Sequence, residues 1–488
     1  MRKFIFGFAL LFVSTLVIGQ NAFLNRAFWN ENTSIEAIKI AIEKGNDPTE
    51  MNFSGFDATT FAILADAPVS VVEFLLDIKG NDINKVTHDS RNYLMWAGMK
   101  GNFEMIAMII KRGGNVNVID SKGNNLQTYT AGGGVTNPEV YELYKKYGLR
   151  LDQTNRVGGT ILHSLAQNVN SLDEMDYFIK EGLDLKAKDK KGNTLIHYAA
   201  SQGNIQLIKE LVSKGLDIKA KNESGETALF FAARGKRGHQ NKKVVFEDLE
   251  KLGLDIQAVN TDGQNLLHFV AAMNHNHDVF DFLIANKVDV NKVDNAGNLP
   301  LMNAVARNNA TGFSALYAAT KNKFQVNKEG HSLFTFALRS KNSKVTAKIE
   351  ADLELKINYN LIDNQGNNLI THLVETYDSK QYDFFNNYFS LLLSKNVNPQ
   401  NHSLHVAVLK GDTRLIESLL NTKIDINAKN SEDLTPLQLA AMKSHDLTVL
   451  KLLIAKGADK SIQTDFDETA YDLAKENELL KGDIEFLK

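Results

Sequence analysis

Four histidines lie at equivalent places in the sequence, each just inside an apolar segment that resembles the others. Imidazole is a common metal ligand and a common acid–base catalyst, so its recurrence raises the question of a metal or catalytic site. Segments of this kind are expected to form stacked helices with axes about 8–10 Å apart, whereas a zinc–nitrogen bond is about 2.0–2.1 Å long. Neighbouring histidines therefore cannot share one ion, and we expect them to be structural, with no metal site and no cofactor. These residues are His163, His197, His268 and His405.

Two other segments contain residue types that bind ligands elsewhere. His275, His277 and Asp278 form a dense polar cluster, but three weak ligands in one loop make a poor metal site. A polar connection between two helices, with Asp278 near a helix N-terminus, is the better interpretation. The glycines Gly132–Gly134 suggest a phosphate cradle, yet they follow an expected helix rather than a strand and no Lys-Ser or Lys-Thr pair comes after them. We expect a broken helix connection there.

The sequence also lacks the patterns that carry catalysis. Paired carboxylates such as Asp173 with Glu174, or Glu350 with Glu354, are expected on solvated helix faces. No nucleophile elbow, dinucleotide-binding fingerprint or HExxH motif is present, and the chain has 0 Cys, which excludes a thiolate nucleophile. No insertion between the repeats is long enough for a catalytic domain. We therefore predict no catalytic residues and no enzyme activity.

The composition narrows the remaining classes of protein. Hydrophobic residues make up 43% and charged residues 23% of the chain, which is ordinary globular composition. The formal net charge is −3 and the sequence pI is about 6.5, so no strong field recruits nucleic acid or an acidic membrane surface. Asn is frequent, at about one residue in ten, which suits turns that need side-chain-to-backbone hydrogen bonds.

A period of about 33 residues organises the elements that must position these side chains. Each unit begins with a marker residue, usually Gly. A Thr or Asn and a short apolar helix start follow it, as in Gly192-Asn-Thr-Leu-Ile-His197. Successive markers are separated by 33 to 38 residues. A chain of 488 residues would ordinarily be expected to form about three domains, but this regular spacing predicts one continuous array of repeats. The markers are Asp57, Ser90, Gly123, Gly158, Gly192, Gly225, Gly263, Gly297, Gly330, Gly366, Gln400, Asp433 and Asp467.

The unit from Asp189 to Lys221 shows the physical basis of the repeat. A turn ends at Gly192, which is free to take positive φ, and Thr194 is placed to cap the first helix. After Gly203 a second helix presents Leu207, Ile208, Leu211 and Val212 on one face, and an extended segment leads from Leu216 to Lys221. One such pair cannot bury its apolar face alone, so neighbouring pairs must stack.

This pattern resembles the ankyrin repeat, whose motif is a turn, then Thr-Pro-Leu-His-x-Ala, then two antiparallel helices. The closest copy is Asp433-Leu-Thr-Pro-Leu-Gln-Leu-Ala-Ala441 with Leu453-Ile-Ala-Lys-Gly-Ala-Asp459. Only Pro300 and Pro436 fill the proline position, so most copies depart from the consensus. The resemblance implies an all-α solenoid of helix-turn-helix repeats with β-turn or hairpin tips. It also implies that the recurring histidine bonds to the backbone of the turn, and that the protein binds other proteins.

The domain organisation that we predict starts with an export signal. Arg2 and Lys3 precede an uncharged apolar run that is short for a membrane span, so residues 1–19 are predicted to be a signal peptide cleaved before Gln20, with an uncleaved anchor as the alternative. Residues 20–52 are predicted to form an N-terminal capping repeat and residues 467–488 a C-terminal cap. The array between them, 53–466, should hold about twelve units, with degenerate ones near 120–153 and 328–400.

Two sets of surface residues are candidates for partner binding. A basic ridge is expected on turns and on the connection at the longest gap, where it could attract an acidic protein or an anionic glycan. Solvated turn residues screened by salt are the alternative. The ridge comprises Lys186, Lys188, Lys190, Lys191, Lys219, Lys221, Lys236, Arg237, Lys242 and Lys243. Partner anchors predicted from repeat position are Lys190, Lys191, Asn193, Tyr198, Gln202, Thr261, Asp262, Gln264, Phe269 and Met273.

The function predicted from these features is non-catalytic binding of another protein on the concave face of the solenoid. The protein is expected to be an exported monomer, periplasmic or secreted, from a Gram-negative bacterium, without a stable membrane span and without a nucleic-acid partner. Two alternatives stay open. One is a binder of an anionic ligand or glycan through the basic ridge, and the other is a purely structural envelope protein.

Overall fold

The computed structural model describes residues 21–488, and in this part of the chain the regular elements are helices. Extended pairing there is limited to isolated bridges, such as Ile119 with Asn125 and Val326 with Ser332. The all-α fold class is therefore confirmed, with turns rather than paired strands at the tips. The predicted signal peptide, residues 1–19, lies outside the described residues. No helix within residues 21–488 combines the length and apolar character needed to cross a bilayer.

The chain divides into two compact units, one ending at Glu223 and the other running from Ser224 to Lys488. The 33-residue period gives no sign of this division, because the repeat register continues through it. Each unit is described by itself below.

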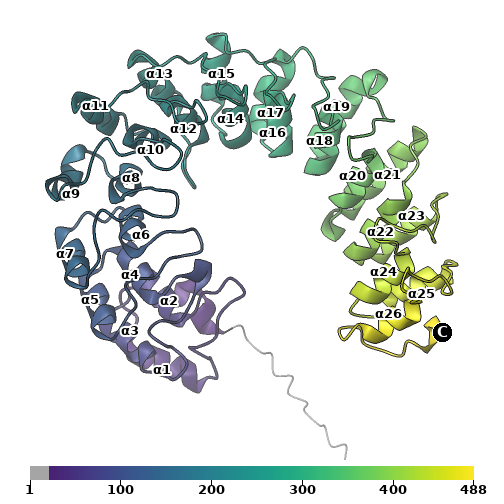
Figure 1. Ribbon diagram of the computed structural model, residues 1–488, viewed down its shortest axis with the longest axis horizontal. Coiled ribbons are helices and arrows are strands. Elements are labelled where there is room, and N and C mark those ends of the chain that lie inside the picture. The colour runs from purple at the N-terminus through teal and green to yellow at the C-terminus, as the bar shows by residue number, and fades with distance from the viewer. Residues whose placement is uncertain (1–20) are drawn as a thin grey trace, which may run out of the picture. The chain divides into compact units, whose positions relative to one another are not determined.

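Unit 1 consists of helix pairs in two rows (Figure 1). First helices such as α4, α6 and α8 pack on one another, and second helices such as α3, α5 and α7 form the other row. The helices of unit 1 are η1 (Ala22–Leu24), η2 (Arg26–Phe28), α1 (Ile35–Glu43), α2 (Ala58–Leu64), α3 (Val69–Leu76), η3 (His88–Ser90), α4 (Tyr93–Lys100), α5 (Phe103–Lys111), α6 (Leu126–Gly132), α7 (Pro138–Lys146), α8 (Ile161–Ala166), η4 (Leu172–Met175), α9 (Asp176–Lys180), α10 (Leu195–Gln202) and α11 (Ile205–Ser213).

Unit 2 continues the same alternation. Even-numbered first helices stack from α12 to α26, and odd-numbered second helices pack behind them. The helices of unit 2 are α12 (Ala228–Arg234), α13 (Lys243–Lys251), α14 (Leu266–Met273), α15 (His277–Ala285), α16 (Pro300–Ala306), α17 (Ala310–Ala319), α18 (Leu333–Ser340), α19 (Ser343–Leu353), η5 (Glu354–Lys356), α20 (Leu369–Glu375), η6 (Ser379–Gln381), α21 (Tyr382–Ser394), α22 (Asn401–Lys410), α23 (Thr413–Leu420), α24 (Pro436–Lys443), α25 (Thr448–Ala455), α26 (Ala470–Glu476) and η7 (Glu485–Leu487).

The repeat from Asp189 to Lys221 has the local structure that its residues predict. Gly192 has φ of +78° and so occupies the left-handed region that an L side chain rarely adopts. Thr194 is the N-cap of α10, which ends at a left-handed Gly203. Ala199 and Ala200 are fully buried, and their small size allows the close approach of neighbouring first helices. The repeat therefore stacks through a small-residue face on α10 and an apolar face on α11.

One of the markers predicted from the sequence is wrong in register, because Asp57 is the N-cap residue of α2 and not a turn residue. In this repeat the turn glycine is Gly55, with φ of +78°. Gln400 keeps the register, but it is the N-cap residue of α22, which begins early. The error arises because an N-cap Asp and a turn Asp both favour side-chain-to-backbone hydrogen bonds, so composition alone does not separate the two positions.

Both predicted caps include 3-10 turns, and one connecting segment differs from its prediction. Near the N-terminus of the described chain, η1 and η2 are 3-10 turns. Residues 467–488 end in η7, a single 3-10 turn. The segment Leu216–Lys221 turns rather than running extended, because the Ala220 N–H donates to the Asp217 carbonyl at 3.2 Å.

Candidate partner-binding surface

The turns that precede the first helices, called tips here, are joined to one another by backbone hydrogen bonds. From His88 to Glu223 in unit 1, and from Thr261 to Asn364 in unit 2, one N–H of each tip donates to a carbonyl of the tip before it, over 2.7–2.9 Å. This ladder fixes neighbouring tips at a constant spacing and makes each row of tips a rigid platform. In unit 1 the bonds run from His88 to Gly55, Ser121 to Asp89, Arg156 to Gly123, Lys190 to Val157 and Glu223 to Lys191. In unit 2 they run from Thr261 to Ser224, Asn295 to Asp262, Lys328 to Ala296 and Asn364 to Glu329.

The recurring histidines tie each first helix to the next tip. Nδ1 of His268 accepts the Asn265 N–H at 3.2 Å, which leaves Nε2–H to donate to the Asn298 carbonyl at 3.1 Å. His163 bonds in the same way to Thr160 and Asn193, and His405 contacts the Leu434 carbonyl at 2.9 Å. Burial lowers the pKa of His163, His268 and His405, so each stays neutral at physiological pH. His197 likewise accepts the Thr194 N–H at 3.1 Å, so all four rings make backbone hydrogen bonds of the kind that a structural role requires.

The predicted anchors of unit 1 differ in how much surface they offer. Lys190 and Lys191 are exposed on one tip, where the Lys190 ammonium donates to the Arg156 carbonyl at 2.9 Å. Asn193 is buried, 6% exposed, and its amide donates to Asp189, so it supports the turn rather than presenting a contact surface. Tyr198 is half-buried and donates its hydroxyl to Asp189 at 2.7 Å. Gln202 is also half-buried, at the end of α10.

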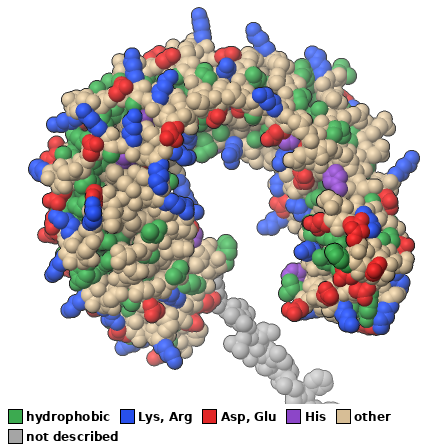
Figure 2. Space-filling model, viewed as in Figure 1, with side chains coloured by type: hydrophobic (Ala, Val, Ile, Leu, Met, Phe, Trp, Pro, Cys, Tyr) green, Lys and Arg blue, Asp and Glu red, His purple; other side chains and the backbone are tan. Residues whose placement is uncertain are grey.

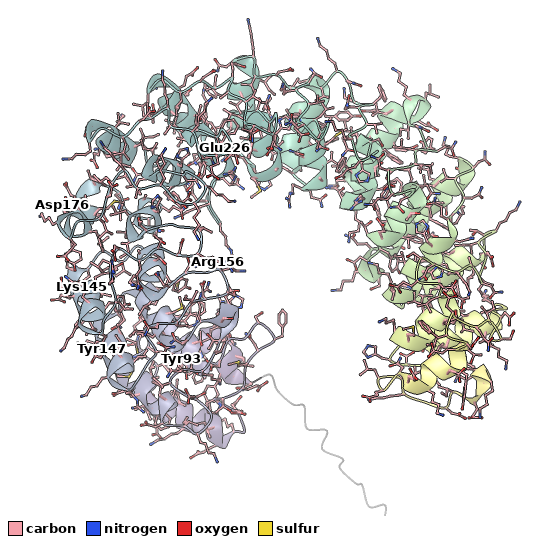
Figure 3. The ribbon with its side chains drawn as sticks, in the orientation of Figure 1. Tyr93, Lys145, Tyr147, Arg156, Asp176 and Glu226 are labelled. Atoms are coloured by element: carbon pink, nitrogen blue, oxygen red, sulfur yellow. The ribbon has the colours of Figure 1, made fainter. Side chains whose placement is uncertain are left out.

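The lysines predicted for the ridge in unit 1 are all exposed, and no ion pair involves them within residues 21–488. Figure 2 shows Lys and Arg side chains gathered on the tip side of this unit, beside α8 and α10. Arg156, which the sequence analysis did not select, belongs to the same row and points to the tip side in Figure 3, whereas Lys145, Tyr147 and Asp176 lie on the second-helix side. The ridge residues in unit 1 are Lys186, Lys188, Lys190, Lys191, Lys219 and Lys221.

The anchors predicted in unit 2 form one exposed tip and one aromatic face. Thr261 and Asp262 are exposed on the tip, and the Gln264 amide donates to Asp294 on the next tip at 3.3 Å. Phe269 lies edge-on to Phe230, with ring centroids 5.4 Å apart. Met273, at the end of α14, is 46% exposed.

Residues 235–240 of the connection at the longest gap line an open hollow of about 480 Å³, together with Arg234, Met273 and Asn276. The Arg234 guanidinium lies 5.0 Å from the ring centroids of both Phe231 and Phe269 and bonds to Glu226 at 2.7 Å. This cation is therefore held in one position, which sequence reasoning missed because Glu226 and Phe269 come from different segments. In the ridge set of unit 2, Lys236 lines the hollow with Arg237, Lys242 is exposed, and Lys243 lies within α13 and pairs with Glu247 at 3.1 Å.

The segments considered for ligand chemistry have structural partners. His275 contacts Asn309 at 3.0 Å and His277 contacts Asp281 at 2.9 Å, while Asp278 lies in the first turn of α15 as predicted. Gly132 ends α6, so the glycine run is the expected helix connection. The structure also brings together a buried cluster of His331, Asp363 and His372 that the sequence analysis did not select.

Each unit is thus a stack of helix pairs with a hydrogen-bonded row of tips, the architecture of a repeat protein. The comparisons with known families agree with this class. A profile described as ankyrin repeats (3 copies) matches residues 162–246 and 240–329, and one described as ankyrin repeats (many copies) matches residues 404–454. The chain is an ankyrin-repeat protein, and these repeats support a role in protein–protein interaction.

Three curated proteins illustrate the range of relatives. The chain is 28% identical over 143 residues to the nuclear factor NF-kappa-B p105 subunit of Gallus gallus, which covers 28% of this chain and 14% of that protein. It is 28% identical over 151 residues to the transient receptor potential cation channel subfamily A member 1 of Homo sapiens, covering 29% and 13%. It is 26% identical over 136 residues to the phosphocholine transferase AnkX of Legionella pneumophila, covering 27% and 14%. The chain thus spans only a small part of each relative.

Proposed function

We propose that the protein is an exported, non-catalytic scaffold that binds a partner protein on the tips and first helices of its ankyrin repeats. The observation that carries this proposal is the ladder-bonded row of tips in unit 1 with its exposed lysines. A rigid platform loses little conformational entropy on binding, because its backbone is already ordered before the partner arrives.

The lysines of this row favour a partner with an acidic surface. Lys190 and Lys191 occupy one tip, and Lys219 and Lys221 lead to the next. The only carboxylate within the tip Asp189–Gly192 is Asp189, which is buried and occupied by hydrogen bonds to Asn193 and Tyr198. Neither Lys190 nor Lys191 forms an ion pair with this carboxylate, and their positive charge would accelerate the encounter with an acidic partner.

The location that we propose rests on the N-terminal sequence. Arg2 and Lys3 followed by the uncharged apolar run Phe4–Gly19 are typical of an export signal. N-terminal sequencing of the protein isolated from an envelope or culture fraction should begin at Gln20. A protein that begins at Met1 in the cytoplasmic fraction would contradict export.

The interaction surface is tested with two matched double variants. Lys190→Gln with Lys191→Gln alters the tip, whereas Lys209→Gln with Lys214→Gln removes two exposed lysines from α11 and its C-cap and leaves the tip intact. Each purified chain captures crosslinked proteins from an envelope extract at low salt. The partner retained by the wild-type chain should fall about tenfold with the tip variant and stay unchanged with the α11 variant. Equal capture by both variants would place the binding surface elsewhere.

The same lysines also favour a second candidate, an anionic glycan. Retention of the wild-type chain on a sulfated-glycan resin, lost in the tip variant and abolished by moderate salt, would support the glycan. Salt-insensitive passage through the resin together with capture of one protein would exclude it.

A further inference from the structure

We propose that His331, Asp363 and His372 form a binding site for one divalent transition-metal ion of the Zn²⁺ type, which clamps two neighbouring tips of unit 2. One ligand atom of each residue lies within 4.8 Å of the other two, and all three residues are buried. The proposal is independent of the partner-binding function, because it concerns what holds the tips together.

The distances agree with a tetrahedral centre. His331 Nε2 lies 3.4 Å and His372 Nε2 lies 3.2 Å from the same oxygen, Asp363 Oδ2. Zinc bonds of about 2.0–2.2 Å at tetrahedral angles separate neighbouring ligand atoms by about 3.3–3.5 Å. Two imidazoles and one carboxylate oxygen are therefore already placed near three corners of such a centre. A water molecule can supply the fourth ligand from the side of Glu329, whose side chain is 70% exposed.

Carboxylates also stand behind both imidazoles. His331 Nδ1 lies 3.3 Å from Glu329 and His372 Nδ1 lies 3.3 Å from Glu375. Metal-binding histidines usually donate their second ring N–H to a carboxylate, which fixes the ring and makes the ligating nitrogen more basic. Here both rings have this arrangement, with Nε2 facing Asp363 and Nδ1 facing a glutamate.

The other hydrogen bonds of Asp363 leave one oxygen for the metal. Oδ1 accepts the N–H groups of Gln365 at 2.8 Å and Asn367 at 2.7 Å, as a turn carboxylate should. Oδ2 faces the two histidines, with the Asn367 amide 3.2 Å away.

The charge of the surroundings suits a divalent cation. Asp363, Glu329 and Glu375 contribute three negative charges, and one cation, Arg339, lies 3.3 Å from His372 Nδ1 and 4.0 Å from Glu375. Arg339 donates to Nδ1 of His372, and Nε2 of His372 lies 3.2 Å from Asp363. With a metal ion on Nε2, the imidazole proton would sit on Nδ1, which faces Glu375.

The position of the cluster explains what the ion would do. His331 belongs to the tip that precedes α18 and Asp363 to the tip that precedes α20, while His372 lies within α20. The bond from the Asn364 N–H to the Glu329 carbonyl, 2.9 Å, joins the same two tips and is the last bond of the ladder within residues 21–488. An ion held by His331 and Asp363 would therefore reinforce the end of the ladder.

The repeats themselves supply substitutions that should preserve folding. Asn193 and Asn298 occupy the place in their tips that His331 occupies in its own, so His331→Asn restores a residue that this position accepts elsewhere. Tyr198 occupies the place of His372, so His372→Tyr recreates the pairing of Tyr198 with Asp189. His277→Asn is the matched control, because it removes one exposed histidine of unit 2 outside the cluster.

The test uses the full chain after removal of metal with EDTA. Calorimetric titration with Zn²⁺ should give one site per chain with a Kd below roughly 1 µM. His331→Asn and His372→Tyr should each weaken binding at least about 100-fold, Glu329→Gln about tenfold, and His277→Asn not at all. Co²⁺ should produce the visible absorption of a tetrahedral centre in the wild-type chain and not in His331→Asn.

A second measurement separates metal binding from folding. Saturating Zn²⁺ should raise the thermal midpoint of the wild-type chain by about 5 °C and leave that of His331→Asn unchanged, while both have the same circular dichroism in EDTA. If the wild-type chain binds Zn²⁺ no more tightly than His331→Asn, the cluster is a hydrogen-bonded one and the proposal is overturned. The same conclusion follows if His277→Asn weakens binding as much as His331→Asn.

Discussion

Asp189 in unit 1 and Asp363 in unit 2 occupy the same place in their tips, yet their surroundings differ. In both, Oδ1 accepts the N–H groups of the residues two and four positions later, over 2.7–2.9 Å. Oδ2 of Asp189 accepts the Tyr198 hydroxyl at 2.7 Å, whereas Oδ2 of Asp363 faces His372 at 3.2 Å. The turn therefore positions a buried carboxylate oxygen, and the residue nine positions later decides its chemistry.

The neighbouring tip adds the second difference. The tip before Asp363 presents His331, while the matching position before Asp189 is Gly159, which has no side chain to offer. Hydrogen bonds from Asn193 and Tyr198 lower the pKa of Asp189 against the effect of burial, so this carboxylate stays ionised as a purely structural acceptor. The comparison teaches that two residues outside the turn, one on the neighbouring tip and one in the following helix, distinguish the candidate metal site at Asp363 from the structural tip at Asp189.

The largest expected change in the free energy of unfolding comes from removing the turn carboxylate that the two tips share. Asp189→Ala leaves the buried Asn193 N–H without its acceptor and should lower the free energy of unfolding by about 3 kcal/mol. Asp363→Ala should cost a similar amount in EDTA, because the Asn367 N–H loses the same acceptor. Urea unfolding measures both losses of stability. Faster amide hydrogen exchange at Asn193 or Asn367 shows that the loss arises in the altered turn. A loss below about 1 kcal/mol at either site would show that its turn does not depend on the carboxylate.

A smaller effect isolates what distinguishes the Asp189 tip. Tyr198→Phe removes one hydrogen bond to an ionised carboxylate and should lower the free energy of unfolding by about 1.5 kcal/mol. Tyr129→Phe is the matched control, since Tyr129 occupies the same repeat position but its hydroxyl contacts only the Met99 sulfur, at 3.3 Å. That control should change the stability by less than about 0.5 kcal/mol in urea unfolding. Equal losses would mean that the bond from Tyr198 to Asp189 contributes nothing specific.

Local sequence signals predicted the repeat but not these tips. The helix pairs, Gly192 in its turn and the histidines bonded to the next tip all depend on residues close in sequence or on the period itself. The pairing of Asp189 with Tyr198 could not be predicted in this way, because it depends on the Tyr198 side chain of α10 pointing back toward the tip that precedes the helix. The cluster of His331, Asp363 and His372 needs two repeats in correct register.

A usable signal for that cluster was nevertheless present. Positions can be counted from the markers Gly330 and Gly366 and compared with the unit at Gly192. His331 then matches Asn193, Asp363 matches Asp189, and His372 matches Tyr198. Comparing residue types at equal positions, rather than searching for ligand spacing along the chain, would have shown them together. The division at Glu223 gave no such signal, because it depends on contacts between helices rather than on residue types.

The smallest expected effect is on the pH dependence of the free energy of unfolding. It compares His268, which titrates, with Gln438, which occupies the same repeat position and does not. Gln438 makes the two bonds that His268 makes, accepting the Thr435 N–H at 2.8 Å and donating to the Glu468 carbonyl on the next tip at 3.4 Å, and it also donates to the Ile462 carbonyl at 2.9 Å. Burial lowers the pKa of His268 in the folded state, so the unfolded chain binds more protons below about pH 6.5. Its contribution to stability is complete above that pH and is lost as the pH falls through the folded value.

His268→Gln should therefore keep both bonds, leave the free energy of unfolding unchanged at pH 7.5, and make the chain more stable than wild type at pH 5. Urea unfolding at the two pH values measures the difference. The gain is limited to the share of the acid sensitivity that His268 contributes, because His163 and His405, whose pKa values burial also lowers, remain in the variant and still titrate. A variant that is less stable at pH 7.5, or equally acid-sensitive, would show that the imidazole does more at this position than bridge a helix to the next tip.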